Sequence, residues 1–252
     1  MAAMAERQDM RTEIDPSGLD YRMFSQRDLT NMVLQRSDVL SDVPRPGRLI
    51  NAWSDGDGAP LKAAVKDRGI IFAQRAARMI QTEFELLKPI LDPIAPKKIA
   101  DIGCGYGMFD LFAHARYGSD LLLIDIEQSD HRHFGFKSQA AAYTSLSSAK
   151  AFLTQNGVPA ARVTTWNPES EDIDPGTKPD VAVSFLSCGF HFPVDMYAPF
   201  FRFGVAPGGT IILDLRNQTY REGLQVLEKL GHVEELHRVK NRRRVVVRKG
   251  KR

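Results

Sequence analysis

The stretch Asp101-Ile102-Gly103-Cys104-Gly105-Tyr106-Gly107 decides the fold expected for this chain. It ends a short apolar run that begins at Lys98, and a helical pattern over about residues 107–117 follows it directly. Glycines at a strand-to-helix turn allow positive φ and let a ligand lie against bare backbone. In open α/β sheets, ligands bind in the crevice outside the carboxyl ends of the strands. The stretch therefore predicts an α/β sheet with a ligand site at that edge.

Apolar runs and helical patterns alternate along the rest of the chain. Strands are expected at 98–102, 120–125, 162–166, 180–186 and 209–214, helices ending at Gly157 and spanning 218–230, and a closing antiparallel hairpin at 232–238 and 242–247. Strands that alternate with helices imply a parallel, doubly wound sheet. We predict a Rossmann-like, doubly wound, mostly parallel seven-stranded α/β sheet with an antiparallel C-terminal hairpin. Its first and fourth strands should lie side by side.

Residues 1–94 show a different pattern. Ser25 is a suitable N-cap for a short helix, and the Pro- and Gly-rich residues 41–60 indicate a long loop. Apolar residues at helical spacing predict an amphipathic helix over about 68–88. Prolines after residue 88 disfavour its continuation. We therefore expect an N-terminal helical extension over 1–94 and a ligand-binding domain over 95–252.

Composition limits the class of protein. Hydrophobic residues make up 43% and charged residues 26%, no run approaches the ~18 apolar residues of a membrane span, and the N-terminal residues lack a secretion signal. The two cysteines form neither a disulfide framework nor a metal-binding pattern. We expect a cytoplasmic protein with no metal site. Residues 238–252 hold nine Lys or Arg, so the net charge of +3 leaves −6 on residues 1–237. A local basic patch is possible on this distribution, but a whole-surface nucleic-acid footprint is not indicated.

The glycine stretch can be interpreted as either of two kinds of cofactor-binding loop. A dinucleotide loop requires G-x-G-x-x-G, but Met108 replaces its third glycine. The carboxylate of Asp101 would repel a phosphate and suits a cofactor with a cationic amino-acid end. The stretch resembles the first motif of the class I S-adenosylmethionine-dependent methyltransferases, an acid followed by G-x-G-x-G. The alternative is a glycine turn without a ligand.

That resemblance implies S-adenosyl-L-methionine as the cofactor and assigns its contacts. They comprise the glycine loop and four further positions: Asp101, Gly103, Cys104, Gly105, Tyr106, Gly107, Asp125, Ile126, Asn167 and Ser187. Asp125 closes the second strand, where the family's acid holds the cofactor ribose, and Glu127 could share that role. Asn167 follows the third strand, where family members present a polar side chain to adenine. An ordinary Asn-Pro turn with Pro168 is an equally natural reading.

The segment after the fourth strand should face the reactive methyl group. His191 is the candidate general base there, since imidazole titrates near neutral pH, and the alternative is a packing histidine. No Asp- or Asn-Pro-Pro-aromatic motif occurs at this point, so the pattern of amide and base-nitrogen methylation is missing. Cys188 follows Ser187 and lacks the Pro-Cys context of cytosine C5 methylation.

The run from Phe185 to Tyr197 also looks like a group of sugar O-methyltransferases, and a weaker likeness covers Phe136–Tyr143. Cys188 stands where an aromatic residue is expected in that group. The resemblance favours methyl transfer to a hydroxyl of a small molecule, with a lean to a saccharide or glycoconjugate. An RNA methyltransferase using the basic residues 242–252 and a non-catalytic cofactor-binding protein are the alternatives. Residues 1–94 would then form a lid that selects the substrate.

Overall fold

The computed structural model describes residues 14–127, 144–172, 176–239 and 241–251. The chain divides into two compact units. The sheet unit comprises Ile90–Cys104, Arg116–Ile126 and Pro159–Arg252. The helical unit comprises Met1–Pro89, Gly105–Ala115 and Glu127–Val158.

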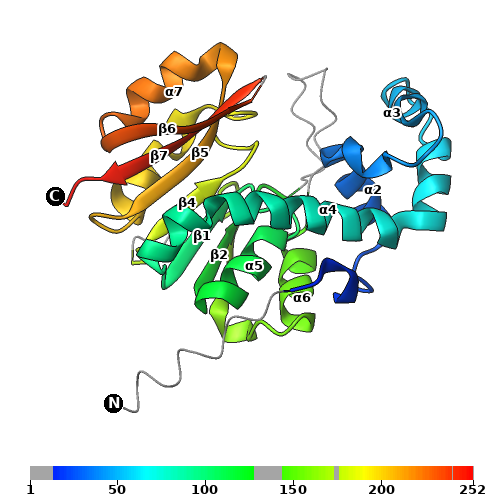
Figure 1. The fold of residues 1–252 in the computed structure, drawn as a ribbon, viewed down its shortest axis with the longest axis horizontal. Coiled ribbons are helices and arrows are strands. Elements are labelled where there is room, and N and C mark those ends of the chain that lie inside the picture. The colour runs from blue at the N-terminus through cyan, green and yellow to red at the C-terminus, as the bar shows by residue number, and fades with distance from the viewer. Residues whose placement is uncertain (1–13, 128–143, 173–175, 240, 252) are drawn as a thin grey trace. The chain divides into compact units, whose positions relative to one another are not determined.

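The sheet unit contains a seven-stranded sheet in the order β3-β2-β1-β4-β5-β7-β6 (Figure 1). Its strands are β1 (Lys98–Ile102), β2 (Asp120–Ile124), β3 (Val163–Trp166), β4 (Val181–Ser184), β5 (Thr210–Arg216), β6 (Gly231–Val239) and β7 (Arg242–Lys249). The five strands β3, β2, β1, β4 and β5 pair in parallel, and β7 joins β5 antiparallel. The prediction of a mostly parallel sheet closed by an antiparallel hairpin is confirmed, as is the pairing of β1 with β4.

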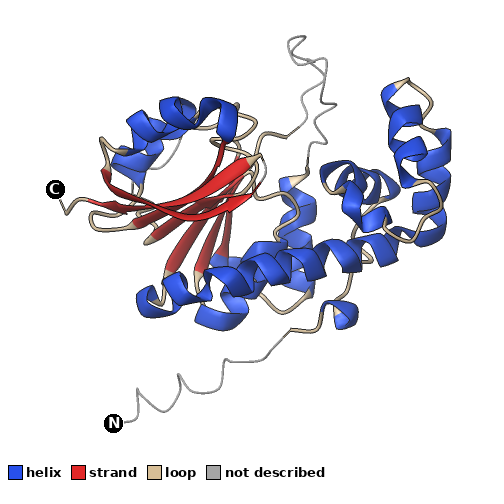
Figure 2. Ribbon diagram, turned by 45° about the horizontal axis from the view of Figure 1, so that its top comes forward, coloured by secondary structure: helices blue, strands red, loops and turns tan. Residues whose placement is uncertain are grey.

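Continuous apolar runs make the central strands. Every residue of β4 and nearly every residue of β1, β2 and β5 is buried, as expected for strands covered on both faces. One face packs in a cluster with Phe200, Phe201 and Val205 and with Leu227 of α7 (Tyr220–Leu227). The outer strand β6 is mostly exposed and lies at the edge of the twisted sheet (Figure 2).

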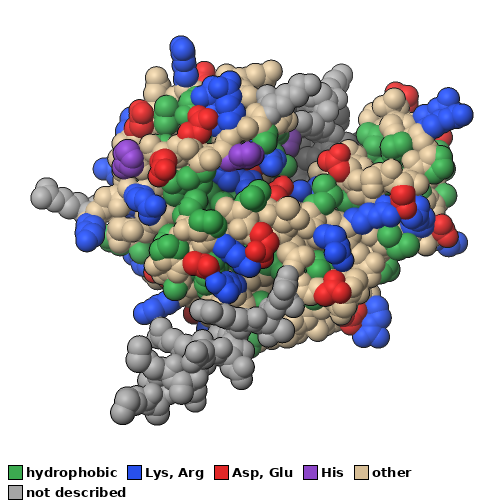
Figure 3. Space-filling model, viewed as in Figure 1, with side chains coloured by type: hydrophobic (Ala, Val, Ile, Leu, Met, Phe, Trp, Pro, Cys, Tyr) green, Lys and Arg blue, Asp and Glu red, His purple; other side chains and the backbone are tan. Residues whose placement is uncertain are grey.

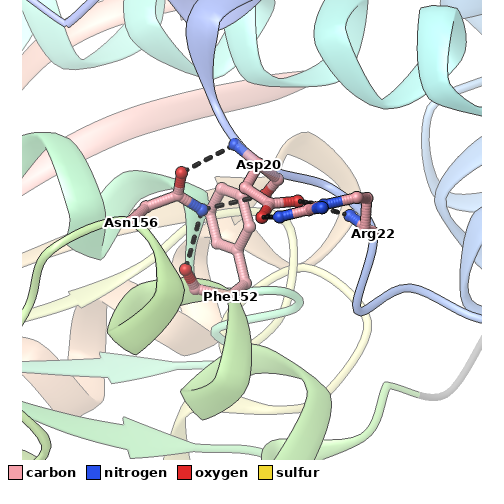
Figure 4. A network of polar contacts seen from close by, with 4 residues as sticks. All are labelled: Asp20, Arg22, Phe152 and Asn156. Atoms are coloured by element: carbon pink, nitrogen blue, oxygen red, sulfur yellow. Dashed lines mark hydrogen bonds and ion pairs between the residues drawn. The ribbon is translucent and has the colours of Figure 1, made fainter.

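The helical unit is built from α2 (Gln26–Gln35), α3 (Pro46–Ser54), most of α4 (Ala59–Ile94), most of α5 (Met108–Tyr117) and α6 (Leu146–Gln155). An aromatic group forms part of its core: Phe24 stacks on Phe152 of α6 at 5.3 Å and meets Tyr106 edge-on at 5.1 Å between ring centroids. Asn156 exchanges hydrogen bonds with the backbone of Asp20 at 2.8 and 2.9 Å (Figure 4). These contacts fix the segment before α2 against the end of α6.

Two predictions in the first 94 residues are wrong. The expected loop over 41–60 contains α3, which begins at Pro46 after Arg45 in the left-handed region. Proline suits a first helical position because its missing N–H would lack an intrahelical acceptor there. The helix expected over 68–88 is α4 and continues through Pro89 to Ile94. Leu87 and Leu91 are both buried, and burying two such side chains offsets the ~3 kcal/mol cost of an interior proline.

One detail of the strands also differs from expectation. The fourth strand ends at Ser184, because Leu186 adopts a left-handed φ of 59° that breaks the extended run. In the C-terminal hairpin, Arg244 is buried and pairs with Asp214. The likeness over Phe136–Tyr143 lies outside the described residues. Within the described part of the chain, no helix combines the length and apolarity of a membrane span.

Candidate functional site

The first half of the glycine loop is held by backbone contacts at the carboxyl edge of the sheet. β1 and β2 run in parallel register as far as Ile102 and Ile124. The carbonyl of Ile124 then accepts the N–H groups of Gly103 at 2.7 Å and Cys104 at 3.2 Å. Gly103 has a φ of 74°, as predicted for glycine at this turn, and Asp101 is buried near the end of β1.

Ser187 lies directly against Gly103. A Cβ atom added to Gly103 would come within 2.2 Å of the Ser187 Cβ, so only glycine fits there. Ser184, at the end of β4, donates its hydroxyl to the Ile102 carbonyl at 2.6 Å and accepts the Cys188 N–H at 2.9 Å. The turn after β4 is therefore fastened to the end of β1. Ser184 was not among the residues selected from the sequence, although a serine that ends a buried apolar strand must find partners for its hydroxyl.

The second half of the glycine loop belongs to the helical unit. Gly105 and Gly107 have φ values of 58° and 71°, again as predicted. Tyr106 is buried and donates its hydroxyl to Asp28 Oδ1 at 3.1 Å. Asp28 also completes the capping box of α2, accepting the Ser25 N–H at 2.9 Å. No sequence signal indicated Asp28, because it lies 78 residues before Tyr106.

The two acids after β2 are in different surroundings. Asp125 is half-buried at the strand end, and its Oδ1 accepts the N–H of Ile126 at 2.8 Å. Glu127 Oε1 accepts the N–H of Leu146, the first residue of α6, at 2.8 Å. Glu127 thus serves as a helix cap, which leaves Asp125 as the better candidate for a ribose contact.

Asn167 stands at the end of β3 in a tight turn. Its side-chain oxygen accepts the Glu169 N–H at 3.0 Å, and its carbonyl accepts the N–H groups of Ser170 and Glu171. The Asn-Pro turn considered from the sequence is present. An adenine contact could use the amide nitrogen of Asn167 or the second lone pair of its oxygen.

Tyr197 is a buried tyrosine in the segment after β4. Burial raises the pKa of its phenol above the ordinary value, and the carboxylates of Asp125 and Glu169 raise it further.

His191 lies in a compact turn after β4. The Ser187 carbonyl accepts the N–H groups of Phe190, His191 and Phe192 at 3.0, 2.8 and 3.1 Å. The His191 side chain is exposed, and its ring meets Phe190 edge-on at 4.9 Å. The protein removes water from part of the imidazole and thereby lowers its pKa, and the charge of Arg216 lowers it further. A neutral imidazole at neutral pH is the form that can accept a proton.

Two other chemistries find little support at this edge. Burial raises the pKa of the Cys188 thiol well above its ordinary value, which keeps it protonated and unsuited to nucleophilic attack. Within the described ranges, no three His, Cys, Asp or Glu side chains gather closely enough to hold a metal ion. His131 and His133 with Asp130, which lack a further ligand at metal-binding spacing in the sequence, lie outside those ranges.

Comparisons with known proteins identify solved structures with a similar fold. No protein-family model matches the sequence, and no curated protein matches it. A protein of Nostoc punctiforme PCC 73102 assigned as an O-methyltransferase has 17% identity and a TM-score of 0.51; the match covers 71% of this chain and 59% of that one. A geranyl diphosphate methyltransferase in complex with GPP and sinefungin has 15% identity, coverages of 73% and 81%, and a TM-score of 0.49. Human N-acetylserotonin methyltransferase in complex with SAM has 12% identity, coverages of 75% and 58%, and a TM-score of 0.46.

The chain shares the Rossmann-like fold of the Nostoc protein and spans about three fifths of its length. The resemblance read from the glycine loop is confirmed at the level of the fold.

Proposed function

We propose that the chain binds S-adenosylmethionine at the carboxyl edge of its sheet and transfers the methyl group to a hydroxyl of a small molecule. The observation that carries this proposal is the glycine loop: Gly103, Gly105 and Gly107 all adopt positive φ directly after a strand that holds a buried acid, Asp101. The methyltransferase fold of the Nostoc protein supports the same reading. That the chain is an enzyme follows from this proposal.

The residues at this edge fit such a cofactor. Ser187 packs directly against Gly103, so both would border the cofactor loop, and Asp101 supplies a carboxylate suited to the cationic amino-acid end. Asp125 with Ile126 would hold the ribose, and the amide of Asn167 would meet the adenine. Cys104, Gly105, Tyr106 and Gly107 complete the loop. When bound, the cofactor supplies an electrophilic methyl carbon.

His191 is the group proposed to remove the proton from the acceptor hydroxyl. Its lowered pKa keeps the imidazole neutral, and the turn anchored by the Ser187 carbonyl holds it after β4. Exclusion of water and alignment of the acceptor hydroxyl with the methyl group would supply the remaining acceleration of methyl transfer. Residues 1–94 would serve as a lid that selects the substrate. A saccharide or glycoconjugate acceptor is favoured by the run from Phe185 to Tyr197.

An RNA acceptor has weaker support. Within the described hairpin, Arg244 and Arg242 contact Asp214, and Arg243 contacts Glu235 at 3.2 Å, so these arginines already face carboxylates. Acidic and basic side chains are interspersed on the face seen in Figure 3. Salt-sensitive RNA binding that disappears on deleting residues 242–252 would favour this alternative.

The test is calorimetric titration with S-adenosylhomocysteine. The wild type should bind, and Asp101→Asn, which keeps the side chain's shape and removes its charge, should bind at least about tenfold more weakly. Asp180→Asn is the matched control, because Asp180 accepts the N–H groups of Lys97 and Lys98 at the opposite end of β1. No heat with the wild type at millimolar ligand would overturn the proposal. Methyl transfer to any acceptor would dismiss a non-catalytic role.

A further inference from the structure

Four arginines meet where β5 ends beside β7. Arg216, the last residue of β5, is in register with Arg242, the first residue of β7, and Arg243 and Arg244 follow. Arg244 forms a bidentate pair with Asp214 at 2.7 and 2.8 Å, and Asp214 also lies 3.5 Å from Arg242. Arg243 reaches Glu235 at 3.2 Å. These three guanidinium groups therefore have carboxylate partners.

Arg216 differs from the other three. Among the described residues, no carboxylate lies within ion-pair distance of its guanidinium. The side chain is half-buried and covers the ring of Phe190, with 5.2 Å between the guanidinium carbon and the ring centroid. A partly desolvated arginine offers a planar set of donors that suits a carboxylate or phosphate.

Phe190 is in contact with both this cation and the proposed base. The guanidinium of Arg216 lies over the Phe190 ring. The ring of His191 meets the Phe190 ring edge-on, with 4.9 Å between the two centroids. The backbone joins the same elements, because the Arg216 N–H donates to the Gly189 carbonyl at 2.9 Å. Of the described residues, Arg216 is the charged group that acts on the imidazole. Arg216 and His191 thus contact the same ring, and the charge of a group bound to Arg216 would act on the imidazole as the charge of Arg216 does.

We propose that Arg216 binds an anionic group of the methyl acceptor, a carboxylate or a phosphate, and so presents a neighbouring hydroxyl to His191. This inference rests on the proposed function and narrows its substrate class to acidic or phosphorylated hydroxy compounds. It also couples binding to catalysis. An anion at Arg216 offsets the positive charge that lowers the pKa of His191, so the imidazole becomes a stronger base when the acceptor is in place.

The test follows the imidazole of His191 by NMR during pH titration, with the signal assigned through His191→Gln. Phosphate should raise the pKa of His191 in the wild type, and acetate in a parallel series tests a carboxylate. In Arg216→Gln the pKa of His191 should start higher and stay unchanged with either anion. Arg221→Gln, which removes an exposed arginine of α7, should behave as the wild type.

Arg216→Lys keeps the positive charge but loses the planar set of guanidinium N–H donors. It should therefore bind whichever of the two anions shifts the pKa of His191 in the wild type about tenfold more weakly. If Arg216→Gln fails to fold, as judged by thermal melting, the Lys variant decides. No shift in the wild type with either anion, or an equal shift after Arg216 is replaced, would overturn the anion site. Binding of S-adenosylhomocysteine to the same samples separates that failure from a failure of the proposed function.

Discussion

The two halves of the glycine loop are held by different means. Asp101 to Cys104 rest on main-chain hydrogen bonds to Ile124 and on the close approach of Ser187, all within the sheet unit. Gly105 to Gly107 rest on side chains of the helical unit, chiefly the hydroxyl of Tyr106 on Asp28. Strand pairing positions the first half, and a hydrogen bond between distant segments of the chain helps to position the second. The sheet unit should therefore be the more sensitive of the two to changes in buried contacts.

The largest expected effect on stability compares one ion pair from each unit. Arg244→Met leaves Asp214, which is fully buried, with Arg242 at 3.5 Å, and should lower the free energy of unfolding by about 3–5 kcal/mol. In the helical unit, Arg36 pairs with Glu83 at 3.3 Å, and both side chains are about one fifth exposed. Arg36→Met should cost about 1 kcal/mol or less. Urea denaturation measures both, and equal losses would contradict the difference between the units.

The next effect compares two glycines with positive φ. Gly157 ends α6 with a φ of 96° and has nothing within 4 Å of an added Cβ, so Gly157→Ala should cost only the backbone strain of about 1–2 kcal/mol. Gly103→Ala should cost that strain and a further ~1–3 kcal/mol, because the new methyl group meets Ser187. The same urea measurements report both values.

A second substitution tests whether the clash with Ser187 causes the extra loss of stability in Gly103→Ala. Adding Ser187→Gly to Gly103→Ala removes the clash and should restore stability to that of Gly157→Ala, while S-adenosylhomocysteine binding should recover in part. A double variant as unstable as Gly103→Ala would show that Ser187 is not the cause.

These comparisons also explain what could be predicted from the sequence. The strands of the sheet unit and the positive φ values of the loop follow from local signals, namely apolar runs and glycines. Helix α3 and the continuation of α4 past Pro89 do not, since burial of residues such as Leu91 overrides a local preference. Arg244 and Asp214 lie 30 residues apart in the sequence, and no pattern in the hairpin predicts that they pair.

The candidate site divides in the same way. Gly103, Asp125 and His191 could be selected because strand ends and motif spacing identify them. The contact of Asp28 with Tyr106 and the cation of Arg216 beside His191 depend on how distant segments fold together. The binding roles of all these residues stay predictions until a ligand is measured.

A smaller effect tests the long-range support of the loop. Tyr106→Phe removes a hydroxyl that donates to the carboxylate of Asp28, and should cost about 1.5–3 kcal/mol. Tyr21 is a matched control in the same unit, because its buried hydroxyl donates to the neutral Pro16 carbonyl at 2.7 Å. Tyr21→Phe should cost about 0.5–1.5 kcal/mol. Hydrogen exchange of α2 should accelerate more in Tyr106→Phe, and the reverse order would reject a role for Asp28 in holding the loop.

The smallest expected effect is the dependence of stability on the protonation of His191. Its pKa is lowered in the folded protein, first by partial desolvation and then by Arg216, so the unfolded chain takes up a proton more readily. As pH falls below the ordinary imidazole value of about 6.5, protonation therefore favours unfolding, and the loss is complete once pH passes below the folded-state pKa. The melting temperature of the wild type should fall more steeply over this window than that of His191→Gln. Arg216→Gln should lie between the two, because it removes the second cause of the shift and leaves the first. Identical slopes for the wild type and His191→Gln would mean that the imidazole of His191 titrates as it does in the unfolded chain, and the case for a neutral base held ready after β4 would then lose its electrostatic support.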